Sequence, residues 1–193
     1  SVQVSRNVKI AESKNRNSIR KDVYRIRQQL HLDEQLYVNI VDVLELGLPV
    51  IDPQFHLIPV EEKELLGRYA ETKPSEHAIL VRESVYNAAC RGVGWARMIL
   101  AHELGHYYYH DAASVTYAYL DRNAKISPDI DPERQADIFA AEFLAPSGEI
   151  KGMSVLEVQK ACGVSKSAAQ NQLRQCSNIA RRQKKKKAVR QKA

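Results

Sequence analysis

The chain has 193 residues, of which 44% are hydrophobic and 27% charged; this composition suits a globular domain with a buried core, and no apolar run approaches the roughly 18 residues of a membrane-spanning helix. Three cysteines, odd in number and widely scattered, exclude a disulfide framework and favour a reducing, cytoplasmic compartment. The net charge of +6 is local, because residues 181–193 hold eight cations and no acid, which leaves the rest of the chain close to neutral.

The first predicted elements are a flexible lead and two helices. Residues 1–16 are polar and lack periodicity, so we expect a flexible N-terminal segment. Apolar positions then recur at helical spacing and predict a helix with one buried face, formed by Ile19, Val23, Ile26 and Leu30. Asp33 is predicted to cap a second helix, which would end at Gly47 before Pro49.

Short strands are predicted next, over residues 55–60, 65–70 and 77–82. The sequence Lys73-Pro74-Ser75 supplies the turn between the last two strands. These strands predict a small, mainly antiparallel sheet, and together with the helices they indicate an α+β fold.

The second half of the chain is predicted to be helical. Apolar spacing predicts a helix over residues 93–110, a loop over 111–131 and another helix from Pro132 to Leu144. Two further short helices are predicted around Gly163, with Ser165 as the N-cap of the second, which gives a helix-turn-helix-like element. The basic run that follows is typical of a solvated, disordered end; its functional alternative is a weak contact with nucleic acid.

Residues 102–106 read His-Glu-Leu-Gly-His within a predicted helix. Two histidines four residues apart lie on one helix face, about one turn from each other, so both imidazoles can reach one ion. Imidazole nitrogens suit Zn²⁺, and a catalytic zinc keeps one position for water, from which Glu103 would accept a proton. The spacing therefore predicts a zinc site with His102 and His106 as ligands and Glu103 as the general base.

A catalytic zinc needs a third protein ligand. His110 shares the face of the two histidines but lies about 12 Å from His102 along a continuous helix, so we interpret it as a packing residue or as a partner of a ligand. Glu133 and Asp137 share a face of the next helix, where Glu133 can bind the ion and Asp137 can accept the free N–H of a ligating histidine. Glu142 falls on the opposite side of that helix and is interpreted as structural.

A peptidase also needs a donor that stabilises the oxyanion formed when water attacks a peptide carbonyl. The helix that carries the two histidines offers such groups directly after His106. They are Tyr107, Tyr108, Tyr109 and His110, and the sequence leaves the choice among them open.

Two segments resemble the paired motifs of the ImmA/IrrE family of metallopeptidases. The first is Ala-His-Glu-Leu-Gly-His at 101–106, and the second is Glu-Arg-Gln-Ala-Asp-Ile-Phe-Ala-Ala-Glu-Phe-Leu-Ala-Pro at 133–146. The resemblance covers roughly residues 35–175 and implies zinc bound by His102, His106 and Glu133, with Glu103 as base. It also implies a zincin-like domain of the gluzincin type in a cytoplasmic bacterial or mobile-element protein. Characterised relatives cleave helix-turn-helix transcriptional repressors, so the resemblance implies a repressor as the substrate.

These observations predict four segments: a flexible start (1–16), a zincin-like metallopeptidase domain (17–150), a helix-turn-helix-like element (151–178) and a basic disordered tail (179–193). The leading hypothesis is a zinc-dependent endopeptidase that cuts a cytosolic protein. The alternative is a non-catalytic regulator with a structural zinc, which acts on DNA through the helix-turn-helix-like element. A structural zinc has four protein ligands, whereas the sequence offers three convincing donors, which favours catalysis.

Overall fold

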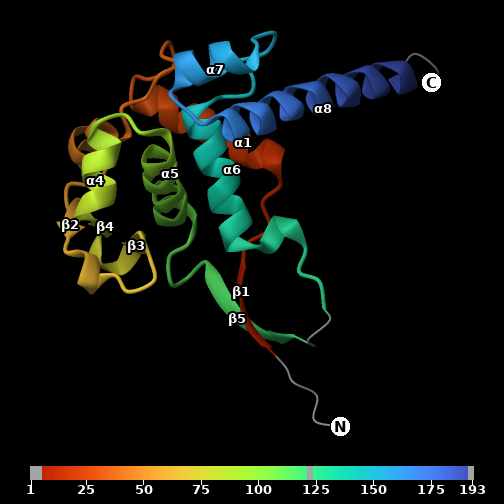
Figure 1. The fold of residues 1–193 in the computed structure, drawn as a ribbon. Coiled ribbons are helices and arrows are strands. Elements are labelled where there is room, and N and C mark those ends of the chain that lie inside the picture. The colour runs from red at the N-terminus through yellow and green to blue at the C-terminus, as the bar shows by residue number, and fades with distance from the viewer. Residues whose placement is uncertain (1–5, 121–123, 191–193) are drawn as a thin grey trace.

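The structure is a computed structural model that describes residues 6–120 and 124–190. The chain has an α+β fold with two small sheets and several helices (Figure 1). None of the described helices is long and apolar enough to cross a membrane. The parts of the expected flexible start and basic tail at 1–5 and 191–193 lie outside the described residues.

The elements follow one another in the order β1 (Arg6–Ala11), α1 (Arg16–Gln29), α2 (Ile40–Asp42), η1 (Val43–Gly47), α3 (Leu48–Ile51), β2 (His56–Val60), η2 (Glu62–Glu64), β3 (Ala70–Lys73), η3 (Pro74–Glu76), β4 (Ala78–Arg82), α4 (Glu83–Cys90), α5 (Gly94–Tyr109), β5 (Val115–Leu120), η4 (Pro128–Ile130), α6 (Pro132–Leu144), α7 (Val155–Cys162) and α8 (Lys166–Arg190).

The three-stranded sheet has the order β2-β4-β3, so β3 lies at an edge. Strands β2 and β4 form where they were predicted, but they pair in parallel, and only β3 is antiparallel to β4; the sheet is mixed rather than mainly antiparallel. The strand predicted at 65–70 is wrong, since β3 begins only at Ala70. Gly67 has a φ of +74° and bends the chain between the buried Leu65 and the strand, which prevents an extended run there.

A two-stranded antiparallel ribbon joins β1 to β5, with Arg6 opposite Leu120 and Ala11 opposite Val115. The expectation of a flexible start is therefore wrong for 6–11, and the predicted loop at 111–131 contains a strand. The local signal was an alternation of Val8 and Ile10 with polar neighbours, which is typical of a half-buried strand. Its partner lies more than a hundred residues away, where local pattern gives no indication of pairing.

The N-terminal helices are partly as predicted. Helix α1 buries Ile19, Val23 and Ile26, but the second helix is capped by Asn39 rather than Asp33. It also continues past Gly47 through the π-helical turn η1 into α3. Pro49 is tolerated because it occupies the first turn of α3, where a missing backbone N–H costs little. Helix α4 was not predicted, although its buried Val85, Ala88 and Ala89 have helical spacing.

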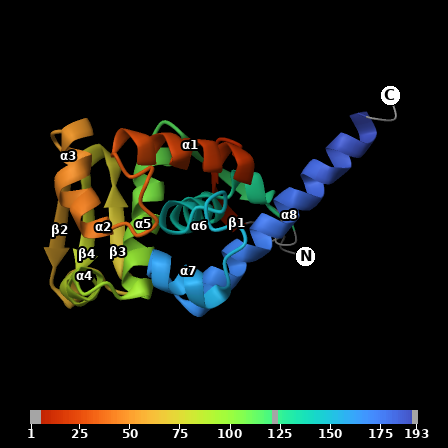
Figure 2. The same cartoon turned by 90° about the horizontal axis from the view of Figure 1, so that it is seen from above.

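Helices α5 and α6 pack closely side by side, with the sheet on one side of α5 and α1 against α6 (Figure 2). Both helices match their predicted bounds to within one residue. Gly105 permits the close approach, because a Cβ there would lie 3.1 Å from Ala136 Cα and 3.1 Å from Phe139 Cβ. The Asp131 side chain caps α6 by accepting from the backbone N–H of Glu133.

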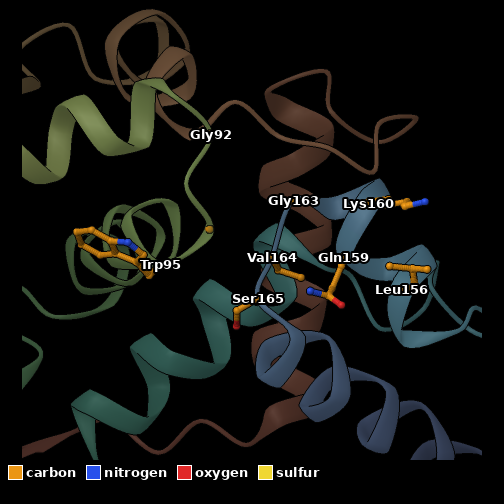
Figure 3. A pocket seen from close by; sticks show the side chains of 9 residues that line it. Gly92, Trp95, Leu156, Gln159, Lys160, Gly163, Val164 and Ser165 are labelled. Carbon is orange, nitrogen blue, oxygen red and sulfur yellow. The ribbon is translucent and has the colours of Figure 1, made fainter.

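The pair α7–α8 meets at Gly163, which has a φ of +64°, as the predicted turn requires. The guanidinium of Arg97, on α5, donates to the Cys162 carbonyl at 2.9 Å and lies 4.2 Å from the centre of the Tyr37 ring. This turn, α7 and the start of α5 border an open hollow of about 500 Å³, with Trp95 on one side and Leu156 on the other (Figure 3). The α7–α8 turn is thus anchored to the helix that bears the histidine pair.

The backbone of α8 remains helical as far as Arg190 and extends away from the body of the molecule (Figures 1 and 2). The prediction of a disordered tail from residue 179 is therefore wrong over 179–190. Arg, Lys, Gln and Ala are good helix formers, and a helix already begun at Lys166 needs no new nucleation to continue through them. The division of the chain into separate segments stays a prediction.

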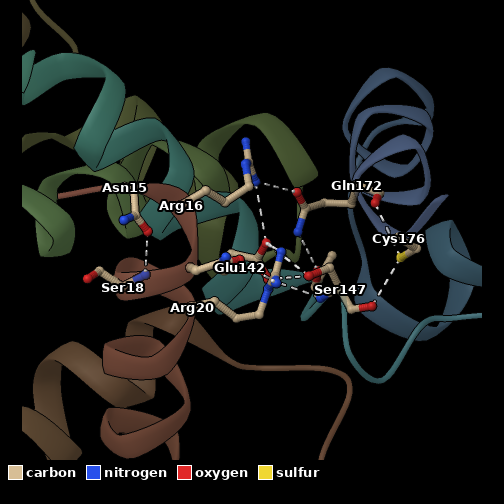
Figure 4. A network of polar contacts seen from close by, with 10 residues as sticks. Asn15, Arg16, Ser18, Arg20, Glu142, Ser147, Gln172 and Cys176 are labelled. Atoms are coloured by element: carbon tan, nitrogen blue, oxygen red, sulfur yellow. Dashed lines mark hydrogen bonds and ion pairs between the residues drawn. The ribbon is translucent and has the colours of Figure 1, made fainter. Parts of the chain in front are cut away.

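The buried carboxylate of Glu142, on α6, lies in a polar network that reaches α1 and α8 (Figure 4). It accepts from the backbone N–H of Ser147 at 3.1 Å and forms ion pairs with Arg16 and Arg20 of α1. Arg16 also contacts Gln172 of α8 at 3.4 Å. Glu142 therefore has the structural surroundings that its position on α6 predicted.

Candidate metal centre

The histidine pair lies one turn apart on α5, and both side chains face α6. Their Nε2 atoms are 2.9 Å apart, and the side chains are 21% and 16% exposed for His102 and His106. Successive turns of a continuous helix produce this arrangement, and the close packing at Gly105 brings α6 opposite them.

Glu133 enters from the first turn of α6 and completes a cluster of three donors. Its two carboxylate oxygens lie 3.3 Å from His102 Nε2 and 3.3 Å from His106 Nε2. All three donor groups lie within 4.8 Å of one another. Two nitrogens bound tetrahedrally to zinc at about 2.0–2.1 Å would be about 3.3 Å apart, so the donor set and its spacing fit a zinc ion.

Asp137 lies one turn beyond Glu133, and its Oδ1 is 2.8 Å from His102 Nδ1. Burial by itself lowers the pKa of His102, but the hydrogen bonds to Asp137 and Glu133 outweigh it and raise the pKa to about 9. The hydrogen bonds of Glu133 to His102, and then to His106, hold the pKa of Glu133 well below its usual range. With Nδ1 engaged by Asp137, the nitrogen that faces the other two donors is Nε2.

Glu103 lies beside the donor cluster and is held by a residue from the sheet. The hydroxyl of Thr72, on the edge strand β3, is 2.5 Å from Glu103 Oε2 and 2.9 Å from the Glu103 carbonyl oxygen. A hydroxyl has one hydrogen to donate, so the two oxygens compete for it. The contact joins the edge of the sheet to the side chain that would act as base.

These side chains open into a cleft of about 580 Å³. One wall comes from β3 and its neighbours, including Arg68 and Glu71, and the other from the β1–β5 ribbon, including Lys9 and Tyr117. His102, Glu103, His106, His110 and Glu133 line its floor. The cleft therefore combines a donor cluster for a cation with a carboxylate beside it and with exposed hydrogen-bond donors on its walls.

The model of the IrrE N-terminal-like domain of peptidase family M78 matches residues 72–174. This chain belongs to that family. The matched segment contains Thr72 and all members of the donor cluster, and the resemblance to ImmA/IrrE peptidases in the sequence is thereby confirmed. No curated protein and no solved structure matches the chain. Membership of a metallopeptidase family agrees with the His, His and Glu cluster of the cleft.

Three of the four candidate oxyanion donors have other partners in this M78 domain, and one of them is Tyr107, whose hydroxyl donates to Asp52. The hydroxyl of Tyr109 donates to Asp22 of α1 at 2.8 Å, and the ring is buried, so Tyr109 faces away from the cleft and cannot stabilise an oxyanion there. His110 does line the cleft, but its Nδ1 is 2.8 Å from His106 Nδ1 and its Nε2 is 2.8 Å from Gln135 Oε1. Burial lowers the pKa of His110 to about 4.

Three residues of the site were not predicted from the sequence. Thr72 had no local signal, because its role depends on the edge strand lying against α5. Gln135 sits between Glu133 and Asp137 in the α6 motif, and its role depends on contacts with His110 and with backbone carbonyls that the local sequence does not indicate. Tyr117 belongs to β5, which was expected to be a loop.

Proposed function

We propose that the chain is a zinc-dependent metalloendopeptidase, with His102, His106 and Glu133 as ligands and Glu103 as general base. The observation that carries this proposal is the meeting of the three donors from α5 and α6 beside a carboxylate in an open cleft. A histidine pair from one helix and a glutamate from a later one correspond to the gluzincin-type arrangement that the family resemblance implies. Three donors leave room for water, as a catalytic zinc requires.

When bound, zinc would polarise the peptide carbonyl and make water more acidic. The chain's own residues do the rest. Glu103 takes a proton from the attacking water and can later deliver it to the amine that leaves. Asp137 keeps His102 oriented, and the Thr72 hydroxyl restrains the Glu103 carboxylate. Arg68 and Tyr117 line the cleft and can donate to the oxygen on which negative charge develops.

The proposed substrate is a protein segment in extended conformation. Among the described residues no strand pairs with the outer edge of β3, beside Glu103, and an extended peptide can add to such an edge through backbone hydrogen bonds. On the basis of the family resemblance, we propose a helix-turn-helix repressor as the substrate. The three cysteines are free thiols, which suits a reducing cytoplasm in which only restricted proteolysis is tolerable.

Two kinds of variant test the proposal, because loss of a metal ligand and loss of the general base should have different effects. Alanine at His102, His106 or Glu133 should abolish the expected content of about one zinc per chain, measured by elemental analysis. Glu103→Gln should retain zinc and fold while cleavage falls by about a hundredfold or more, because an amide cannot accept the proton. The control is Glu83→Gln, an exposed residue on α4, which should behave as wild type.

Cleavage should be followed on any helix-turn-helix repressor found to be encoded beside this chain and on unfolded casein. One or two discrete repressor fragments, lost with a chelator and with Glu103→Gln, would support the regulatory role. An intact repressor together with freely degraded casein would indicate a general peptidase. Wild-type cleavage by Glu103→Gln would exclude Glu103 as the base, and undiminished zinc in Glu133→Ala would exclude Glu133 as a ligand.

A further inference from the structure

Gln135 is a buried residue of α6, 1% exposed, whose amide group has a single permitted orientation. Its Nε2 donates to the backbone carbonyl of Glu12 at 2.8 Å and to that of Asp129 at 2.7 Å. A carboxamide nitrogen has two hydrogens, and these two carbonyls take both. If the amide were turned over, its oxygen would face two carbonyl oxygens, so Oε1 must point toward His110.

The orientation of Gln135 determines which nitrogen of His110 carries hydrogen. His110 Nε2 faces the acceptor Gln135 Oε1 at 2.8 Å, so Nε2 is the N–H donor. In a neutral imidazole the other nitrogen is then an acceptor. His110 Nδ1 lies 2.8 Å from His106 Nδ1, and this contact is a hydrogen bond only if His106 Nδ1 donates.

The donor and acceptor roles that Gln135 fixes extend to His106, a member of the donor cluster. With its hydrogen on Nδ1, neutral His106 has its lone pair on Nε2, the atom that lies 3.3 Å from Glu133 and 2.9 Å from His102 Nε2. We propose that Gln135 and His110 are positioning residues that select the metal-binding tautomer of His106. The inference rests on the proposed metal site. The backbone carbonyls of Glu12 and Asp129 fix the orientation of the Gln135 amide, and this orientation sets which atom donates in each of the hydrogen bonds that follow.

The two ligating histidines are therefore oriented by different means. His102 has a carboxylate partner on α6, whereas His106 has a relay of neutral groups that ends on backbone carbonyls. One of these carbonyls, that of Glu12, follows β1 and lies outside the segment that the family model matches. The N-terminal part of the chain thus contributes to the site although none of its side chains belongs to the donor cluster.

The first test reads the tautomers directly, in protein without metal and independently of catalysis. Long-range ¹H–¹⁵N correlation spectra of the histidine rings should place hydrogen on Nδ1 of His106 and on Nε2 of His110. In Gln135→Met, which has a similar volume but no amide, the His106 signals should shift toward a mixture of tautomers. Hydrogen on Nε2 of neutral His106 in the wild type would overturn the proposal, even if no variant folds.

The second test measures zinc affinity by competition with a chelator. Gln135→Met and His110→Phe should each weaken binding by about 10–100-fold, the usual effect of removing an outer partner of a ligand. Gln172→Met is the matched control, because Gln172 is also buried and donates to a backbone carbonyl, that of Ala145, but has no contact with the donors. It should keep wild-type affinity whatever it does to stability.

The possible outcomes distinguish a failure of this inference from a failure of the proposed peptidase function. Wild-type zinc affinity in both Gln135→Met and His110→Phe would overturn the relay while leaving the peptidase proposal intact. A wild-type chain that binds no zinc would refute the peptidase proposal, and the ring spectra would still decide the tautomers. Equal losses of affinity in Gln135→Met and Gln172→Met would reduce the effect to general destabilisation and so contradict the relay.

Discussion

Asp52 shows how one carboxylate outside the metal centre connects three parts of the fold. It ends α3 and accepts from His77 Nδ1, just before β4, at 2.7 Å and from the hydroxyl of Tyr107 on α5. These two hydrogen bonds, first that of His77, lower the pKa of Asp52. Burial, followed by the bond to Asp52, raises the pKa of Tyr107. The opposite shifts are expected of a hydroxyl that donates to an ionised acceptor.

The shift at Asp52 predicts a dependence of stability on pH. A carboxyl group whose pKa is lowered by folding stabilises the protein above its usual pKa, and that contribution is lost as the pH falls toward the folded value. The free energy of unfolding of the wild type should therefore fall more steeply between about pH 5 and pH 3 than that of Asp52→Asn. Urea denaturation at several pH values measures both slopes.

The control for this measurement is Asp33→Asn, which changes an exposed carboxylate on the loop after α1. It should keep the wild-type slope. If Asp52→Asn has that slope too, the contacts of Asp52 with His77 and Tyr107 contribute nothing to acid sensitivity.

At the scale of elements, the contact between α5 and α6 determines whether the donors meet. Glu133 is on one helix and the two histidines are on the other, and Gly105 sets how closely the two backbones approach. A larger residue at this position must move Ala136 and Phe139, which belong to the same helix as Glu133. Helix packing and the meeting of the three donors are therefore coupled through Gly105.

Gly105→Val should lower the free energy of unfolding by about 1–3 kcal/mol, as overpacking of a core commonly does. It should also weaken zinc binding, because separating the helices moves Glu133 away from His102 and His106. Urea denaturation and chelator competition measure the two effects. Gly148→Val is the matched control, since no atom lies within 4 Å of a Cβ built there. Unchanged zinc affinity in a destabilised Gly105→Val protein would show that the site tolerates a wider helix spacing.

The elements that carry the donors could be predicted because their signals are local. The His-Glu-Leu-Gly-His spacing and the Asp131-Pro132 start of α6 each lie within a few residues, and the structure brings His102, His106, Glu133 and Asp137 together. Strands β1 and β5 were missed because their pairing joins distant segments. Thr72, Gln135 and the orientation of Tyr109 could not be predicted, because they depend on which element packs against α5 or α6.

At the scale of the whole molecule, α8 is the feature that departs most from a compact shape. It holds nine Lys and Arg residues and no acid over residues 166–190. Its first turns are anchored to the body, with Gln172 donating to Ala145 and Cys176 contacting Ser147. The exposed residues there, which include Lys166, Gln170, Asn171 and Arg174, are those that the alternative hypothesis would assign to DNA. The backbone of the rest of the helix continues away from the body of the molecule.

Deletion of residues 181–193 should leave zinc content and peptidase activity unchanged, because the donors and the cleft lie elsewhere. Any affinity of the intact chain for DNA duplexes should fall steeply as salt is raised, and it should largely disappear on deletion. Fluorescence anisotropy with duplexes of unrelated sequence measures both effects. Sequence-selective binding that survives the deletion would favour the first turns of α8 as a DNA reader.

The placement of the ligands along the chain has one more consequence. His106 and Glu133 stand at the two ends of residues 107–132, a stretch that contains β5. An ion held by both would act as a removable cross-link that closes this stretch into a ring and reduces the conformations open to it. Loss of the ion would then loosen the ribbon of β1 and β5, while the separate sheet of β2, β4 and β3 would keep its rigidity. The ribbon contributes one wall of the cleft, so the cleft of the loaded protein would also be more rigid.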